Sequence, residues 1–373
     1  MNIGIIVGEV SGDKLAANLF KNIFLKNKKN KYFGIVGPEL KKLGCNEIFS
    51  INDLSIFGLI EPIFKIRTLI KIKKKILNNF INKIDIFIGI DFPGFNLNIE
   101  NCLKNNGIFI IHIVSPSIWA WRKHRIRHIK KSVNLMMVLF PFEIKFYKKE
   151  KIPVKYIGHP LTELINIKFN EKKIKLNLNV DLNNVIISIL PGSRDNEIKY
   201  HIPLYNKIIR KYDYTKNITF LIPVSNIKQY IFIKNTYFNN NFKNKINIIF
   251  NNFYNCLRIS NIIITVSGTA SLESALHKKL TIVVYKMNNL IFYILKKFVN
   301  IKYISLPNII SMQYVLPEYI QNNCNLKNIY NEISKKNNYI LMIKKFYIIE
   351  KLNQSLKNKA RLTLTTVINK FIL

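Results

Sequence analysis

The sequence predicts an α/β protein made of two doubly wound domains in tandem. The chain has 373 residues, more than a single domain usually holds. Short runs of β-branched residues alternate with longer segments of helical periodicity, which is typical of βαβ units with buried parallel strands. Apolar residues make up 49% of the chain, enough for a sizeable core, so the composition excludes intrinsic disorder and fibrous repeats.

The first predicted domain covers residues 1–165 and begins with a strand at the N-terminus. Segments of helical periodicity, such as Asp13–Phe24 and Ile66–Phe80, lie between its strands. The expected strands are short apolar runs at Ile3–Val7, Ile84–Ile90, Ile108–Val114 and Leu135–Leu139.

The second predicted domain covers residues 183–345 and follows a polar, lysine-rich segment, Asn166–Asn184. Two terminal helices are expected in Ile340–Leu373, and residues 346–373 are expected to pack back on the body. Ligands of such sheets bind at the carboxyl ends of the strands, so we expect a site in a cleft between the two domains. The expected strands are Val185–Leu190, Thr219–Val224, Ile246–Phe250, Ile262–Val266 and Thr281–Tyr285.

The chain is strongly basic, with 58 Lys and Arg against 21 Asp and Glu and a net charge of +37. Such a charge suits an anionic partner, for example nucleic acid, a phospholipid surface or a phosphorylated substrate. The chain is also rich in Lys, Asn, Ile, Tyr and Phe, the residues of A/T-rich codons. Mutational drift would spread lysine over every solvated face without any partner. Charge alone therefore assigns no function.

Targeting signals and cysteine pairs are missing from the sequence pattern. Met1 leads directly into the first apolar run, without the pattern of a signal peptide, and no uncharged apolar run reaches about 18 residues. We therefore expect a cytosolic protein that at most rests on a membrane surface. Four scattered cysteines form no C-x-x-C pair, which argues against a disulfide framework or a structural zinc site.

Three loops at predicted strand ends combine glycine with small polar residues. The first, Gly8–Asp13 (GEVSGD), opens a helix and could hold an anion or a sugar, but it lacks the G-x-G-x-x-G pattern of nicotinamide-binding domains. A plain turn capped by Ser11 or Asp13 is the alternative. The others, Leu190–Arg194 (LPGSR) and Val266–Glu273 (VSGTASLE), lie in the second domain.

The two loops of the second domain together favour a nucleoside diphosphate. Small residues let backbone amides approach a phosphate closely, and Arg194 can add a charge-assisted contact. Glu273, one turn into the next helix, can accept hydrogen bonds from ribose hydroxyls.

Metal ligands are scarce in the sequence. No D-x-D pair is present, and His124 and His128, at i and i+4, lie among Arg and Lys, which favours a solvated basic face over zinc. Asp91 closes the strand Ile84–Ile90 and either points into the expected cleft or caps the following loop. We therefore expect no metal site, and both roles of Asp91 remain open.

Two segments are amphipathic and basic, Phe57–Leu77 and Leu290–Val299. A helix that combines an apolar face with lysines can lie in the anionic headgroup region of a membrane. A core helix with a solvated lysine face has the same pattern, and both interpretations remain open.

Taken together, the motifs resemble those of one known family. From residue 1 to about residue 330 the chain is similar to the lipid-A-disaccharide synthases, glycosyltransferases of bacterial outer-membrane biogenesis. The matching segments are Gly8–Asp13, Gly34–Gly44, Gly89–Asn96, His112–Arg122, Pro141–Tyr147, Ile152–Leu161, Leu190–Ile198, Ser267–Glu273 and Ser305–Ile310.

The resemblance implies a GT-B fold, with an acceptor- and lipid-binding first domain and a UDP-sugar-binding second domain. The implied reaction joins UDP-2,3-diacylglucosamine to 2,3-diacylglucosamine 1-phosphate with inversion and releases UDP. It implies no metal cofactor and no nucleic acid partner. It also implies peripheral association with the anionic cytoplasmic face of the inner membrane, and it leaves a homodimer open.

The resemblance also assigns roles to residues of this chain. The catalytic candidates are Asp91, Glu9 and Arg194. The candidates for binding substrate or UDP are Ser11, Gly12, Ser193, Ser267, Gly268, Thr269, Ala270, Glu273, Asn308 and Gln321.

In one respect the sequence departs from the family. Gly94 stands where the family usually has an aspartate that is a candidate general base, so the identity of the base in this chain is open. Ala16 replaces a usual glycine, a milder change. Two other functions also remain open: a UDP-sugar epimerase of the same fold, and a non-enzymatic nucleic-acid-binding protein. The latter would need a base-reading motif or an aromatic stacking platform, which the sequence does not show.

Overall fold

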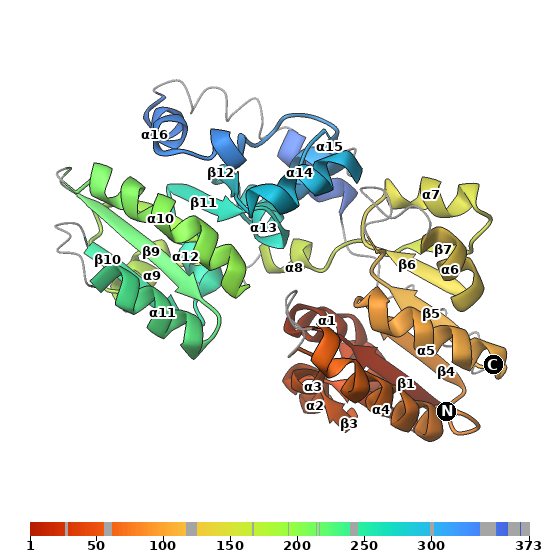
Figure 1. Cartoon of the computed structure of the whole chain (residues 1–373). Coiled ribbons are helices and arrows are strands. Elements are labelled where there is room, and N and C mark those ends of the chain that lie inside the picture. Colours follow the sequence, from red (N-terminus) through yellow and green to blue (C-terminus); the bar gives the residue numbers. More distant parts are fainter. Residues whose placement is uncertain are drawn as a thin grey trace. The chain divides into compact units, whose positions relative to one another are not determined.

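The structure is a computed structural model that describes residues 1–26, 29–55, 62–116, 125–165, 168–192, 194–213, 215, 217–238, 245–298, 302–335, 348–356 and 366. The chain divides into two compact units. Unit 1 comprises Met1–Glu163 and Ser355–Leu373, and unit 2 comprises Leu164–Gln354. Each unit contains one parallel sheet with helices on both faces (Figure 1).

The sheet of unit 1 has seven strands within the described ranges, in the order β3-β2-β1-β4-β5-β6-β7. Strands β2 and β3 lie on one side of β1 and strands β4 to β7 on the other, so the winding reverses between β1 and β4. The strands are β1 (Asn2–Val7), β2 (Lys31–Val36), β3 (Asn46–Ser50), β4 (Ile86–Ile90), β5 (Phe109–Ile113), β6 (Leu135–Val138) and β7 (Val154–Tyr156). The helices are α1 (Val10–Lys26), α2 (Pro38–Lys42), α3 (Ile51–Ser55), α4 (Pro62–Phe80), α5 (Pro93–Asn105), α6 (Arg125–Ser132) and α7 (Glu143–Lys149), followed by α8 (Leu161–Ile165) at the unit boundary.

The sheet of unit 2 has six strands in the part of the chain that is described, in the order β10-β9-β8-β11-β12-β13. Here the winding reverses between β8 and β11. The strands are β8 (Val185–Leu190), β9 (Ile218–Val224), β10 (Lys245–Phe250), β11 (Ile262–Val266), β12 (Leu280–Tyr285) and β13 (Glu318–Ile320). The helices are α9 (Glu171–Asn177), α10 (Asp195–Lys211), α11 (Ile227–Phe238), α12 (Phe253–Ile259), α13 (Thr269–Leu276), α14 (Asn289–Phe298), α15 (Leu306–Ser311) and α16 (Leu326–Ser334), with a short 3₁₀ turn at Gln321–Asn323.

Both faces of each sheet are buried. In β1, Ile3 and Ile5 pack with α1 on one face, whereas Ile6 belongs to the cluster that contains α4 and α5 on the other. In unit 2, Ile187 packs with α10 and α16, and the adjacent Ile186 packs with α12. Burial on two faces explains why these strands are continuous apolar runs rather than alternating ones.

The predicted α/β fold of two doubly wound units is confirmed, and every strand expected from the sequence is present with small differences at its ends. The sequence pattern missed β2, β3, β7 and β13, and it missed α9 inside the expected polar linker. Strands β7 and β13 have three residues each, too few for a periodic signal. Asn170 is the N-cap of helix α9, and its side chain accepts a hydrogen bond from the Lys173 amide at 3.1 Å.

Two further expectations concern helices. Residues 348–355 are helical, and the rest of the expected terminal helices in Ile340–Leu373 lies outside the described residues apart from Leu356 and Thr366. Within the described ranges, none of the helices has the length and apolar character needed to cross a membrane.

Candidate active site

In unit 1, the point of reversed winding brings two predicted elements together. Strand β1 pairs with β4, with Val7 opposite Ile90, so the loop Gly8–Asp13 and Asp91 both follow adjacent strand ends. In open α/β sheets ligands bind at such a switch point. Glu9 and Ser11 are exposed here, and Gly12 is buried against Val7, where a Cβ atom would lie 2.9 Å from a valine methyl.

The turn after β4 is strained and closely packed against the turn after β1. Asp91 and Phe92 have φ angles of 53° and 49°, in the left-handed region that non-glycine residues rarely adopt. A Cβ atom on Gly8 would lie 2.1 Å from that of Phe92, so only glycine fits at this contact. Such strain amounts to about 1–3 kcal/mol per residue and persists only where surrounding contacts impose it.

The backbone of Asp91 is held from two sides. Its amide donates to the Ile113 carbonyl at 2.9 Å, and its carbonyl accepts from the Asn96 side-chain amide at 2.8 Å. Its carboxylate makes no hydrogen bond or ion pair with another described residue, and the side chain is half-buried. The turn therefore fixes the position of a carboxylate that is not used by a cap, although its catalytic role remains a prediction.

Asp13 has a structural role that differs from the cap considered from the sequence. Its carboxylate is buried and accepts hydrogen bonds from the amides of Gly37, Glu39 and Leu40, at 3.0, 2.8 and 3.3 Å. These amides lie at the start of α2, so Asp13 caps α2 rather than its own helix α1. A Cβ atom on Gly37 would lie 2.4 Å from the Asp13 carboxylate, so glycine is required there.

A buried ion pair lies below the Asp91 turn. His112 on β5 and Glu100 on α5 are fully buried, with His112 Nδ1 2.6 Å from Glu100 Oε1. A Cβ atom on Gly89, the β4 residue opposite His112, would lie 2.0 Å from that oxygen, so glycine lets Glu100 reach across β4. Burial by itself lowers the pKa of His112, but the charge and hydrogen bond of Glu100 outweigh it and raise the pKa. No local sequence pattern indicated this pair, because its members come from different elements.

In unit 2, the switch point brings together the two loops predicted to bind a nucleotide. Strand β8 pairs with β11, with Leu190 opposite Thr265, so both loops leave adjacent strand ends. Helices α10 and α13 start at these loops, directly after Arg194 and Gly268. Free amides and the helix dipole favour an anion at both helix starts.

Arg194 is the charged residue of the first loop. Its side chain is 62% exposed, and its guanidinium lies 3.3 Å from the Glu197 carboxylate, which also accepts a hydrogen bond from the Arg194 amide. Gly192 has a φ angle of 107°, and a Cβ atom there would lie 2.6 Å from Glu197. The loop therefore requires glycine at this position and leaves the Arg194 side chain largely in solvent. Ser193 lies outside the described residues.

The second loop is exposed at Gly268 and Thr269 and half-buried at Ser267 and Ala270. Ser267 Oγ donates to the Ile304 carbonyl at 2.7 Å. These positions leave the amides at the start of α13 accessible.

Glu273 is buried and has a partner that the sequence did not indicate. Its carboxylate accepts a hydrogen bond from the Tyr254 hydroxyl on α12 at 2.8 Å. Burial raises the pKa of Tyr254, and the Glu273 carboxylate adds to the shift, so the hydroxyl stays protonated and remains a donor. Tyr254 therefore positions the carboxylate that was predicted to contact ribose.

The side chains of Asn308 and Gln321 form hydrogen bonds that stabilise the loops around β13. Asn308 donates to the Leu316 carbonyl and to Glu318, and accepts from the Val315 and Leu316 amides, at 2.7–2.8 Å. Gln321 accepts from the Met287 amide at 2.8 Å and donates to the Met287 carbonyl at 3.1 Å. Both side-chain amides are used inside the protein, and their roles in substrate binding remain predictions.

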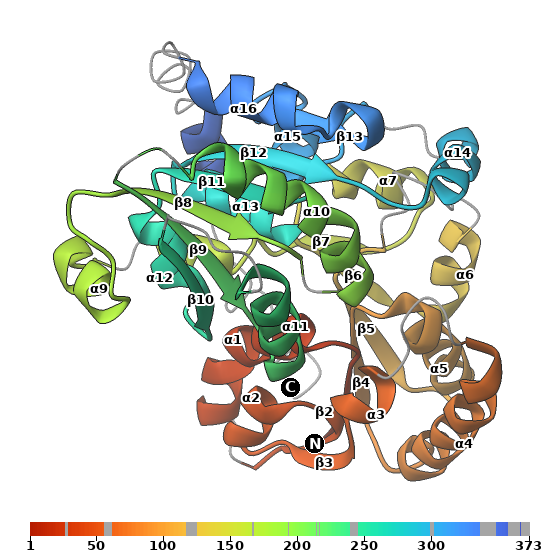
Figure 2. The same ribbon diagram turned by 60° about the vertical axis from the view of Figure 1, so that its left-hand side comes forward.

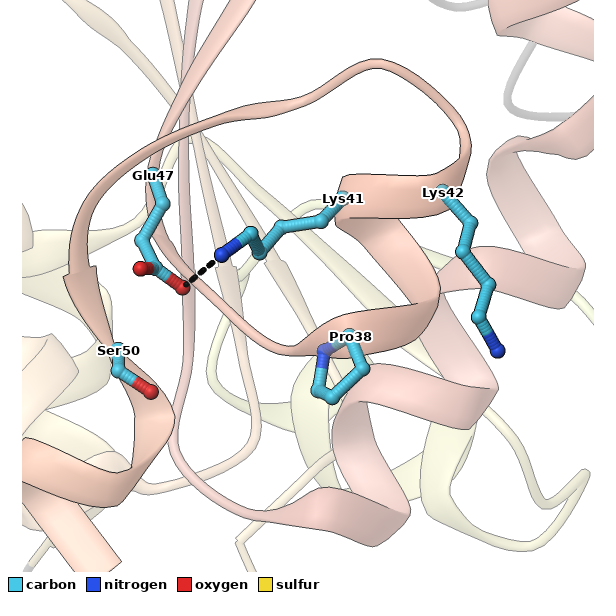
Figure 3. A pocket seen from close by; sticks show the side chains of 5 residues that line it. All are labelled: Pro38, Lys41, Lys42, Glu47 and Ser50. Carbon is cyan, nitrogen blue, oxygen red and sulfur yellow. Dashed lines mark ion pairs between the residues drawn. The ribbon is translucent and has the colours of Figure 1, made fainter.

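Candidate metal ligands and pockets do not extend the sites at the two switch points. Among the described residues, no group of three or more His, Cys, Asp or Glu side chains could hold a metal ion. His128 lies on α6, and His124 is outside the described residues. A pocket of about 370 Å³ lies between α2 and β3 (Figure 3), where Lys41 points toward Glu47 at 3.3 Å. Since Lys42 pairs with Glu39 at 2.7 Å, both lysines of this pocket have carboxylate partners.

The family comparison decides among the functions left open by the sequence. Residues 3–368 match the family model described as lipid-A-disaccharide synthetase. The chain belongs to the lipid-A-disaccharide synthase family. It is 41% identical over 364 residues to the lipid-A-disaccharide synthase of Wigglesworthia glossinidia brevipalpis, covering 94% of this chain and 92% of the relative. It is 33% identical to lipid-A-disaccharide synthase 2 of Legionella pneumophila strain Paris, covering 99% and 97% of the two chains.

Solved structures support the same fold class. UDP-GlcNAc 2-epimerase from Neisseria meningitidis, bound to UDP-GlcNAc, superposes with a TM-score of 0.61 and 13% identity, covering 100% of this chain and 99% of that one. The Methanocaldococcus jannaschii UDP-GlcNAc 2-epimerase gives a TM-score of 0.62 and 14% identity, covering 99% and 100%. At this identity the likeness shows the GT-B-like fold alone. The family match supports a glycosyltransferase of lipid A biosynthesis over an epimerase or a nucleic-acid-binding protein.

The Glu100–His112 pair predicts a specific pH dependence of stability. Because the pKa of His112 is raised above its ordinary 6.5, the pair stabilises the fold fully below that pH and less as pH rises through the folded-state pKa. Burial lowers the pKa of His159, His201 and His277, so these residues titrate below 6.5 and do not contribute above it. As the pH rises above about 6.5, we expect the unfolding free energy of the wild type to fall by more than that of Glu100→Gln.

Urea unfolding at several pH values measures this difference. At pH 6.5 the Glu100→Gln variant should be less stable by about 3–5 kcal/mol, since one member of a buried pair is left without its partner. Parallel pH profiles for the two proteins would show that His112 is neutral in the folded state. The exposed pair Lys42–Glu39 gives a matched control, because Glu39→Gln should leave the profile unchanged.

Proposed function

We propose that the protein condenses UDP-2,3-diacylglucosamine with 2,3-diacylglucosamine 1-phosphate, giving lipid A disaccharide 1-phosphate and UDP. The proposal is supported above all by the two nucleotide-type loops that share the switch point of unit 2, in a chain that belongs to the synthase family. The family implies a UDP-sugar donor and a lipid acceptor, and the acyl groups and the inverting mechanism are the finer part of the proposal.

In the proposed donor site the diphosphate lies at the starts of α10 and α13. As the bond between the anomeric carbon and the diphosphate oxygen breaks, the electron pair leaves with UDP. Arg194 and the amides at both helix starts would stabilise this negative charge. Ser193, Ser267, Gly268, Thr269 and Ala270 would supply close backbone contacts, and Glu273 would accept from ribose hydroxyls.

In the proposed acceptor site the base is Asp91. The 6-hydroxyl oxygen of the acceptor attacks the anomeric carbon on the face opposite the diphosphate, and its proton passes to the Asp91 carboxylate. The strained turn that fixes Asp91 and leaves its carboxylate without a hydrogen bond to the described residues supports this role. Glu9, Ser11 and Gly12 on the neighbouring strand end would contact the acceptor sugar.

The proposal includes no metal cofactor, because cationic and amide donors are already present where the diphosphate charge develops. It includes peripheral association with the cytoplasmic face of the inner membrane, where acylated substrates would be found. A homodimer remains a prediction from the family resemblance.

UDP release tests the proposed reaction and the role of Arg194. We expect UDP only when both acylated sugars are supplied, and we expect Arg194→Ala to lower kcat by about 10²–10³-fold, since one donor to the leaving group is lost. Arg210→Ala, at the other end of the same helix, is the matched control and should retain wild-type turnover. UDP formation without the acceptor would contradict the proposal.

The Tyr254–Glu273 contact predicts a change in donor binding. We expect Tyr254→Phe to raise the KM for the donor by roughly tenfold with kcat nearly unchanged, because a hydrogen bond to a carboxylate contributes about 1.5–3 kcal/mol. Glu273→Ala should have a larger effect on the same constant. Tyr319→Phe is a matched control. Tyr319 lies on β13, the edge strand of the same sheet, and its hydroxyl likewise donates to a carboxylate, that of Glu332, at 2.8 Å. Equal effects of the two tyrosine variants would show general destabilisation only.

Variants at Asp91 and Gly94 test which residue is the general base. We expect Asp91→Asn to lower kcat by about 10²–10⁴-fold while UDP affinity is retained. Gly94 is exposed at the second position of α5, and a Cβ atom there would meet nothing within 4 Å, so Gly94→Asp introduces a carboxylate without steric conflict. If the base function had been lost with the family aspartate, Gly94→Asp would raise the rate and would make Asp91→Asn tolerable. A joint fall of melting temperature and UDP affinity in Asp91→Asn would show that Asp91 only holds the loop.

A further inference from the structure

Helix α14 carries an apolar face that the fold of unit 2 does not cover. Leu290 is 75% exposed, and Ile291, Tyr293 and Ile294 are 53%, 59% and 59% exposed. Leu290, Tyr293 and Ile294 are at i, i+3 and i+4, so they form one stripe along the helix. Figure 2 shows α14 at the margin of unit 2, beyond the end of β12. Large apolar side chains gathered in this way indicate an interaction surface.

The segment before α14 is anchored to the body of unit 2. The Lys286 amide donates to His201 Nε2 at 2.9 Å, and the Met287 amide donates to the Gln321 side chain at 2.8 Å. The Asn288 side chain caps the helix by accepting from the amides of Leu290 and Ile291, at 2.9 and 3.3 Å. The helix start is therefore held by hydrogen bonds, although its apolar face makes little contact with the core.

The charges on α14 indicate the chemistry of its partner. Lys296 and Lys297 lie in the last turn and are exposed, and the segment from Lys286 to Phe298 contains no acidic residue. A second copy of the chain would bring lysines against lysines if two α14 helices packed together, which disfavours that partner. An anionic bilayer offers an apolar interior for the stripe and phosphates for the lysines.

Helix α4, which lies in the other amphipathic and basic segment of the sequence, has a different environment. Ile72, Ile76 and Phe80 are buried in the core of unit 1, and Leu77 packs against the same cluster, so the apolar face of α4 is largely used by the fold. Ile70 is the exception, at 59% exposure. For the part of α4 whose side chains are described, from Arg67 onward, the structure supports the second of the two interpretations left open by the sequence, a core helix with a solvated lysine face.

We propose that α14 docks the protein on anionic membranes, with Leu290, Tyr293 and Ile294 at the boundary of headgroups and acyl chains and Lys296 and Lys297 on lipid phosphates. The proposal deepens the proposed function and rests on it for the choice of a bilayer, because acylated substrates would be held there. It places the docking surface on the unit that carries the nucleotide loops.

Co-sedimentation of the full chain with phosphatidylglycerol-containing vesicles tests the proposal. We expect the double variant Leu290→Ser with Ile294→Ser to weaken vesicle partitioning by about tenfold or more, since two large apolar side chains no longer enter the bilayer. Lys296→Gln with Lys297→Gln should weaken it by roughly fivefold per lysine, and this loss should shrink at high salt or with neutral phosphatidylcholine vesicles.

The matched control is the double variant Ile227→Ser with Ile231→Ser on α11. These side chains are also at i and i+4 in unit 2 and are 60% and 51% exposed, so the change in exposed apolar character is the same. We expect this control, and Ile70→Ser on α4, to partition like the wild type. Equal losses for the α14 and α11 variants would overturn the proposal, as would wild-type partitioning of the α14 variant.

Two further measurements separate docking from folding, association and catalysis. UDP release from detergent-dispersed substrates should be unchanged in the α14 variants, which shows that they fold and that only docking is lost. Failure of the wild type in this assay would instead refute the proposed function, whatever the vesicles show. Light scattering measures the mass of the protein in solution. If the wild type were a dimer and Leu290→Ser with Ile294→Ser a monomer, the partner of α14 would be a second copy of the chain and the proposed bilayer docking would be refuted.

Discussion

One parallel strand pair in each unit determines where the chemistry can lie. Pairing of β1 with β4 places the Gly8–Asp13 loop beside Asp91, and pairing of β8 with β11 places Arg194 beside the Ser267–Glu273 loop. Parallel strands need crossover helices, so every strand end on this edge leads into a helix or a loop. Because the winding reverses, no crossover connection passes over the point between these two strands at the edge of each sheet. Motifs far apart in the sequence meet there because they follow adjacent strand ends.

Carboxylates hold these edges in shape. Asp13 binds the amides of α2, Glu197 binds the Arg194 amide, and Glu318 binds the amides of Ile304 and Ser305 at 2.9 Å. Glu100 pairs with His112 below the Asp91 turn. The chain has only 21 acidic residues against 58 basic ones. Several of these acidic residues thus bind backbone amides or a side chain near strand ends. In the described ranges most lysines are exposed, as on α4, so the basic excess lies mainly on the surface there.

The sequence was sufficient for the fold and for the loops, but not for their partners. Long buried strands are continuous apolar runs and were predictable, whereas the three-residue strands β7 and β13 depend on neighbours for their formation. The loops were identified by composition and by the family resemblance. Tyr254 and Glu100 had no local signal, because their roles arise only when separate elements pack. Helical periodicity predicted apolar faces on both α4 and α14, but only tertiary packing determines which face is covered.

The strained turn at Asp91 bears on the missing family aspartate. Two adjacent residues of this turn, Asp91 and Phe92, lie in the left-handed region, at a free-energy cost that ordinary turns avoid. Here the strain is imposed by the Gly8–Phe92 contact on one side and by Asn96 and Ile113 on the other. These contacts fix the residue immediately before α5 rather than position 94 itself, which is open and makes no contact within 4 Å at its Cβ position. The rigid part of the edge therefore carries Asp91, and this favours Asp91 as the residue through which the acceptor hydroxyl is activated.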